Sequence, residues 1–163
     1  MFNVFITNLG KYNEGELVGK WLTLPCVNLE AELESIGVAD DSMYEEYFIT
    51  DYENDYGYEV GEYENLEELN DIAETLEALD EYEAAHLKAY IEADGCNIVE
   101  ALERYEDSQF YKGMSLVDVA YEIVEECYDL PDFAARYFNY EAFARDLGFD
   151  GYYETEEGTI YIY

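Results

Sequence analysis

The chain has 163 residues, of which 41 are Asp or Glu and 7 are Lys or Arg, so its net charge is −34 at pH 7. This charge disfavours direct binding to nucleic acid or to an anionic membrane surface, and no apolar run reaches the ~18 residues that a membrane span needs. Leu, Ile, Val and Phe make up about a quarter of the residues, more than the ~20% typical of disordered acidic chains, so we expect a folded protein.

Residues 1–62 are predicted to be rich in β-structure. Asn28 can cap a short helix that ends at Gly37. Alternating and β-branched residues predict strands and intervening turns, with strands over residues 2–6, 17–24 and 44–52 and turns at 8–10 and 13–15. We therefore place a β-rich N-terminal domain at residues 1–62.

From Asn65 the apolar residues recur with a helical period. Three helices are expected, over residues 66–79, over 80–94 before Gly95, and from Asn97 to about Tyr105. They can pack together, but their combined core is small, so we expect them to lean on a neighbouring unit. This segment is interpreted as a small helical domain, residues 63–106.

Residues 107–163 are predicted to be mixed. Ser115 and Asp118 form a capping-box-like start to a helix whose apolar face is expected to build a core and support dimerisation. Asn139 can cap a further helix that stops at Gly148, and residues 152–163 favour a hairpin. The expected fold class is α+β, with a C-terminal α+β dimerisation domain at residues 107–163.

The acidic residues lie on the polar faces of the predicted helices. One stripe has the spacing 0, 4 and 7 from Glu67, and another has the spacing 0, 4, 7 and 11 from Asp118. Like charges at i and i+4 cost a few tenths of a kcal/mol per pair, so the repeated choice indicates a use. The candidate partner-binding surface comprises Glu67, Glu68, Asp71, Glu74, Glu77, Asp80, Glu81, Asp118, Glu122, Glu125, Glu126, Asp129 and Asp132.

The charge has a natural comparison in DNA. Duplex DNA carries one negative charge per ~1.7 Å of axis, so a net charge of −34 corresponds to roughly 58 Å of duplex. A folded protein this anionic can present itself to a DNA-binding protein as if it were DNA.

Catalytic and metal sites are weakly indicated. His86 is the only histidine, lacks zinc-ligand partners nearby in sequence, and is expected to be an ordinary helix-surface or interface residue. An EF-hand-like run over residues 51–62 has Tyr56 where the turn requires glycine. No phosphate-binding glycine loop or nucleophile elbow is present, so we expect no enzyme, no metal and no cofactor.

The three cysteines form no CxxC pair, and no signal segment is evident, which favours reduced thiols in the cytoplasm.

The run NLGKYNEGELVGKW, residues 8–21, resembles the N-terminal part of the ArdA antirestriction proteins. The segments YEEYFITDYE (44–53), LEELN (66–70) and YEAFARDLGFDGYY (140–153) are similar to that family and follow in the same order. The resemblance thus extends over nearly the whole chain.

The resemblance implies a protein encoded on mobile elements that protects incoming DNA from type I restriction–modification enzymes. It implies an elongated chain of three small domains, a homodimer formed through the C-terminal one, and no catalysis or cofactor. It also implies an acidic surface that mimics bent B-form DNA and occupies the DNA groove of the methyltransferase core. The family's acid-rich antirestriction motif corresponds here to about residues 118–132.

Two other functions stay open from the residues. The acidic surface can be directed at a different basic DNA-binding protein, such as a nucleoid protein or a repressor. An acidic calcium-binding protein is a further alternative.

Overall fold

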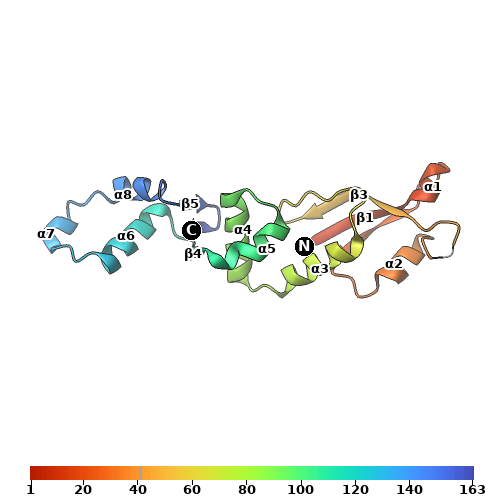
Figure 1. The fold of residues 1–163 in the computed structure, drawn as a ribbon, viewed down its shortest axis with the longest axis horizontal. Helices are drawn as coiled ribbons and strands as arrows, with labels where there is room; N and C mark the ends of the chain where they lie inside the picture. The colour runs from red at the N-terminus through yellow and green to blue at the C-terminus, as the bar shows by residue number, and fades with distance from the viewer. Residues whose placement is uncertain (41) are drawn as a thin grey trace. The chain divides into compact units, whose positions relative to one another are not determined.

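The computed structural model describes residues 1–40 and 42–163, which form an N-terminal unit, Met1–Leu79, and a C-terminal unit, Asp80–Tyr163 (Figure 1). Each unit combines helices with a small antiparallel sheet, which confirms the expected α+β class. The division into three domains stays a prediction.

The N-terminal unit is built on a sheet with the strand order β2-β1-β3. Its elements in chain order are β1 (Phe2–Asn8), α1 (Leu9–Asn13), β2 (Gly19–Leu24), α2 (Leu29–Ser35), β3 (Tyr47–Asn54) and α3 (Leu66–Ala78). Both neighbours run antiparallel to β1, with Val4 opposite Leu22 and Tyr52. The predicted strands are confirmed, and so is the helix capped by Asn28.

The core of the N-terminal unit lies on one face of this sheet. Val4 and Ile6 of β1 are fully buried, and Leu66 and Leu69 of α3 are buried with them. Helices α2 and α3 lie on one side of the strands in Figure 1. Asn70 of α3 is also buried, and its side-chain oxygen accepts a hydrogen bond from the Cys26 amide at 2.7 Å, which fixes α3 against the segment after β2.

The expected turn at residues 8–10 is wrong, because these residues enter helix α1. Asn8 is fully buried and its side-chain oxygen accepts from the Lys11 amide at 2.9 Å, while its Nδ2 donates to the carbonyls of Ile36 and Gly37. These distant acceptors hold Asn8 as a helix cap, which local turn propensity does not reveal.

The C-terminal unit contains a second antiparallel sheet with the order β4-β6-β5. Its elements are α4 (Glu81–Asp94), α5 (Ile98–Arg104), the 3₁₀ turn η1 (Tyr105–Asp107), β4 (Gln109–Lys112), α6 (Leu116–Cys127), α7 (Asp132–Ala135), α8 (Tyr140–Leu147), β5 (Tyr152–Thr155) and β6 (Gly158–Tyr161). Strand β4 and helix α7 were not expected, whereas the β5–β6 hairpin is confirmed. A Cβ at Gly158 would lie 2.3 Å from the Tyr111 carbonyl oxygen, so glycine lets β6 approach β4.

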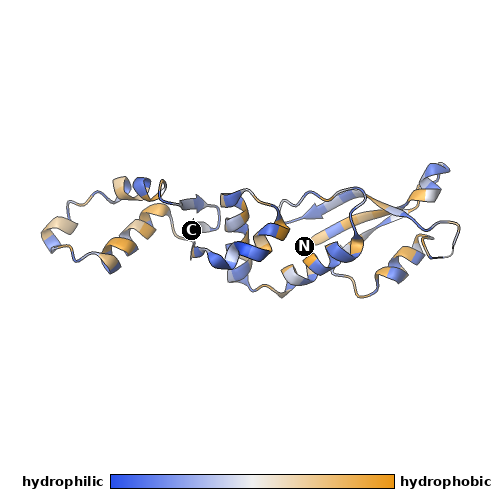
Figure 2. Ribbon diagram, in the orientation of Figure 1, coloured by the Kyte–Doolittle hydropathy of each residue, from blue (hydrophilic) through white to orange (hydrophobic). Residues whose placement is uncertain are grey.

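Two apolar contacts hold the C-terminal unit together. Helix α4 packs on the sheet and on α5, with Leu87 and Tyr90 buried. Helix α6 packs on α8 through a small core of Ala120, Ala144 and Leu147. Figure 2 shows the apolar residues concentrated along α6. Helix α4 packs on this sheet, and α3 packs on β2 of the N-terminal sheet. These two predicted helices therefore do rest on neighbouring elements, as expected.

We expect Leu69→Ala to lower the free energy of unfolding of the N-terminal unit by about 2–5 kcal/mol, because it leaves a cavity at a fully buried position. Trp21 is the chain's only tryptophan and lies on β2, so its fluorescence during urea unfolding reports on this unit. Leu17→Ala is the control, since Leu17 is 74% exposed and its loss should change little. Equal midpoints for the two variants would contradict this core.

Candidate functional site

Helix α3 carries the first acidic stripe. Asn65 begins the helix by accepting hydrogen bonds from the amides of Glu67 at 2.8 Å and Glu68 at 3.4 Å. The apolar positions of the helix are buried against the sheet, which leaves the opposite face to solvent. Five of the predicted carboxylates are exposed on this helix and form the α3 stripe: Glu67, Glu68, Asp71, Glu74 and Glu77.

Helix α6 carries the second stripe. The Ser115 amide donates to Asp118 Oδ2 at 3.0 Å and the Asp118 amide donates to Ser115 Oγ at 3.2 Å, so the predicted capping box is confirmed. Hydrogen bonds from the Ser115 hydroxyl and amide lower the pKa of Asp118, which keeps its carboxylate ionised. Glu125 is exposed on the same helix, and Glu122 is half-buried.

The expected fourth member of this stripe is wrong. Helix α6 ends at Cys127 and Tyr128 is extended, so Asp129 lies beyond the helix and does not continue the spacing. Pro131 then restricts the residue before it and begins the short helix α7, where Asp132 is the first residue. We call Asp118, Glu122 and Glu125 the α6 stripe; Glu126 is exposed on the helix beside it.

Asp80 and Glu81 belong to the start of α4, in the C-terminal unit. Asp80 caps this helix by accepting from the amides of Tyr82 and Glu83, so its carboxylate also has a structural role. Glu81 pairs with Lys112 Nζ at 2.8 Å, which lowers the pKa of Glu81. Lys112 thus partly neutralises Glu81, whereas no ion pair is found for the other predicted carboxylates within the described ranges.

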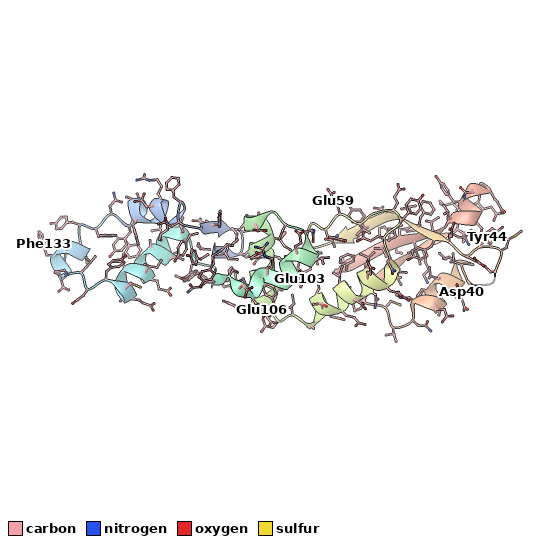
Figure 3. All side chains as sticks on the ribbon, viewed as in Figure 1. Asp40, Tyr44, Glu59, Glu103, Glu106 and Phe133 are labelled. Carbon is pink, nitrogen blue, oxygen red and sulfur yellow. The ribbon has the colours of Figure 1, made fainter. Side chains whose placement is uncertain are left out.

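The acidic charge of the described residues is all at the surface. None of their Asp or Glu side chains is buried, as the exposed Glu59, Glu103 and Glu106 illustrate in Figure 3. Ion pairs in this part of the chain join Lys11 to Glu16, Lys20 to Glu32, Lys112 to Glu81 and the N-terminal amine to Asp55. The field of the carboxylates is therefore largely uncompensated by cations of the same chain.

The EF-hand-like run has a different local structure. Asp51 and Glu53 lie on strand β3, so the run does not form a loop between two helices. Among residues 1–40 and 42–163 no group of three or more His, Cys, Asp or Glu side chains is arranged to hold a metal ion.

A family model described as Antirestriction protein (ArdA) matches residues 4–161. The chain belongs to the ArdA antirestriction family. Membership implies an antirestriction role and interaction with restriction enzymes. The family is not known as a family of enzymes. The comparison with curated proteins finds no match. No helix in the described ranges is long and apolar enough to cross a membrane.

This ArdA-family chain also exposes aromatic side chains near α7, which the sequence patterns did not single out. Phe133 and Tyr137 are each 76% exposed and their rings lie 5.2 Å apart (Figure 3 labels Phe133). Tyr128 and Phe149 are exposed in the same unit. The segment between α6 and α8 has no long helical period, so no pattern predicted which of its aromatic residues would be buried.

Of the two positions expected for His86, a helix surface or an interface, the surface position is wrong, because this α4 residue is buried in the C-terminal unit. Its Nε2 lies 2.7 Å from Ser108 Oγ, and its ring stacks on Phe110 with centroids 5.1 Å apart. Burial lowers the pKa of His86, and the charge of Glu106 opposes that shift in part. A neutral imidazole thus stabilises the packing of α4 on the sheet of this ArdA-family protein.

We expect acid to weaken the C-terminal unit through His86. Its folded pKa is below the ordinary 6.5, so the unfolded chain takes up a proton first as the pH falls. Below pH 6.5 the free energy of unfolding of the native protein should fall relative to that of His86→Gln, by at most about 1.4 kcal/mol per pH unit. Urea unfolding followed by far-ultraviolet circular dichroism from pH 8 to pH 5 measures it. A difference that is constant over this range would contradict the buried neutral state.

Proposed function

We propose that the chain is a DNA mimic that competitively occupies the DNA-binding groove of type I restriction–modification enzymes. The observation that carries the proposal is the regular series of carboxylates on α3 and α6, all exposed except the half-buried Glu122, in a protein whose described ranges contain no buried acid. The proposal makes the known antirestriction role of the family specific in mechanism and in target.

The carboxylate spacing supports this mimicry. Glu67 and Glu77 are ten residues apart on one helix, or ~15 Å at 1.5 Å per residue, and the α3 stripe places five carboxylates in that length. One DNA strand carries about four or five phosphates over the same distance, at ~3.4 Å each. The α6 stripe spans ~10.5 Å, where one strand carries about three or four phosphates.

The energetics of this binding would follow those of DNA. A basic groove that binds either polyanion releases its counterions, so the mimic competes with duplex on the same terms. No bond is made or broken, and the inhibitor would act by occupying the groove. Restriction acts on DNA that has entered the cell, so we place this action in the cytoplasm.

The α3 stripe can be tested by displacement of a fluorescent duplex from a type I methyltransferase, followed by anisotropy between 50 and 500 mM salt. We expect affinity to fall steeply with salt, and the triple change Glu67→Gln, Asp71→Asn, Glu74→Gln to make the log–log slope shallower by up to about three. The matched control is Glu67→Asp, Asp71→Glu, Glu74→Asp, which keeps the charge and should keep the slope.

Three results of this experiment would go against the proposal. Salt-insensitive displacement would falsify the electrostatic mechanism. An equal loss of affinity in the two triple variants would show that the shape of the α3 side chains matters and their charge does not. Displacement of duplex from other basic DNA-binding proteins, with none from the methyltransferase, would redirect the mimic to a different target.

We further propose that the functional form is a homodimer made through the C-terminal segment, residues 107–163. The exposed Phe133 and Tyr137 support this, because large exposed apolar side chains that lie together mark association surfaces. A second copy would remove both rings from water.

Phe133→Asp should convert the dimer to a monomer, because association would then bury an unpaired charge. Light scattering after size exclusion should report a mass falling from twice 18.9 kDa to 18.9 kDa. Tyr63→Asp is the control, since Tyr63 is a similarly exposed aromatic residue of the N-terminal unit. If the Phe133→Asp protein keeps the dimer mass, Phe133 does not lie in the interface.

A further inference from the structure

The sheet of the N-terminal unit has a second face, opposite the one that packs on the helices. Residues paired directly across antiparallel strands share a face. Phe5 pairs with Trp21 on β2 and with Asp51 on β3, so these three side chains form one row across the sheet. Trp21 is 45% exposed, Phe5 is half-buried and Asp51 is exposed, which shows that this face is open to solvent.

The aromatic part of this face is a fixed pair. The rings of Phe5 and Trp21 meet edge to face, with centroids 5.4 Å apart and planes at 82°. Gly19 lies beside them on β2, and a Cβ there would lie 2.7 Å from Phe5 Cε1. The absence of a side chain at Gly19 therefore makes room for the Phe5 ring against the strand.

The acidic part follows from the alternation of β3. Asp51 and Glu53 are two residues apart on one strand, so both carboxylates lie on this face. Asn3 pairs with Glu53 in the neighbouring row, and its Oδ1 is shielded from water without a hydrogen-bond donor.

We propose that this face, made by Asn3, Phe5, Trp21, Asp51 and Glu53, binds an arginine side chain of the basic protein that the chain inhibits. The identity of this partner rests on the proposed function, whereas the choice of arginine rests on the residues of the face itself. Helix α3 presents its carboxylates without any aromatic side chain, so the face adds a recognition element to the general charge of that helix.

Guanidinium fits this face better than ammonium. Its plane stacks on an aromatic ring, and its fork of N–H donors can bond a carboxylate in the same row at the same time. Cation–π contact with tryptophan is the strongest of its kind and gains when the site is desolvated. A lysine ammonium would meet the same carboxylates as a point charge and gain less from the rings.

The first test needs no enzyme. Hexa-arginine and hexa-lysine are titrated separately into the full chain, and binding is followed through the fluorescence of Trp21, the only tryptophan. We expect hexa-arginine to bind at least threefold more tightly at this reporter. The double change Asp51→Asn with Glu53→Gln should reduce that preference to near one. It keeps the local fold, since the Tyr52 amide, which donates to Asp51 Oδ1 at 2.9 Å, can donate equally to a side-chain amide oxygen.

The matched control is Glu30→Gln with Glu34→Gln, which removes the same charge from α2, on the other side of the sheet. It should keep the arginine preference. Equal binding of the two peptides to the native chain would overturn the proposal, and so would equal loss of preference in the two double variants. Circular dichroism confirms that each variant is folded.

The second test uses displacement of duplex from the methyltransferase. Trp21→Leu and Asp51→Asn should each weaken displacement about tenfold, and together by about the same factor, because both remove contacts to one arginine. If the native chain displaces no duplex while the peptides show the preference, the proposed target fails and the arginine site stands. If displacement is intact and the two changes have no effect, the face does not contact this enzyme and its partner role is overturned.

Discussion

The structure depends on one constraint: every element must bury an apolar face while its carboxylates stay in water. An ionised carboxylate without a partner is too costly to bury, and seven Lys and Arg cannot pair with 41 acids. The chain meets this constraint most clearly in α3 and α6, which each have one apolar side, as α3 does with Leu66, Leu69, Ala73 and Leu76. The acids are thereby confined to the outer sides, and this makes them available to a partner.

Helix starts offset part of the repulsion that this arrangement creates. Asn65 caps α3, Asn97 caps α5 and Asn139 caps α8, each through a side-chain oxygen that accepts from a backbone amide. Carboxylates in the first turn, such as Glu67 and Glu68, also interact favourably with the positive end of the helix dipole. The later acids of each stripe have no such benefit. A basic groove would relieve their repulsion, so binding would remove a repulsion that destabilises the free protein.

In the proposed complex, the acidic helices and the open sheet face would contribute different things to recognition. Charge alone gives steering, salt dependence and tolerance of single changes, because it is spread over many groups. An aromatic pair beside two carboxylates would give a directional contact for one side chain, because Phe5, Trp21 and Asp51 are held in register by three strands. A mimic that carries both can be general in its reach and still hold a defined orientation on its target.

The sequence by itself determined the local elements, because their causes are local: the cap at Asn65, the capping box of Ser115 and Asp118, and the stop at Gly95 all appear as predicted. It also determined which helix faces are acidic. Only the tertiary structure decided the rest. Asn8 became a cap through acceptors 28 and 29 residues away, and His86 became buried because β4 pairs with β6 and brings Phe110 beneath it. The register that unites Trp21 with Asp51 depends on hydrogen bonds between distant strands, which no local pattern encodes.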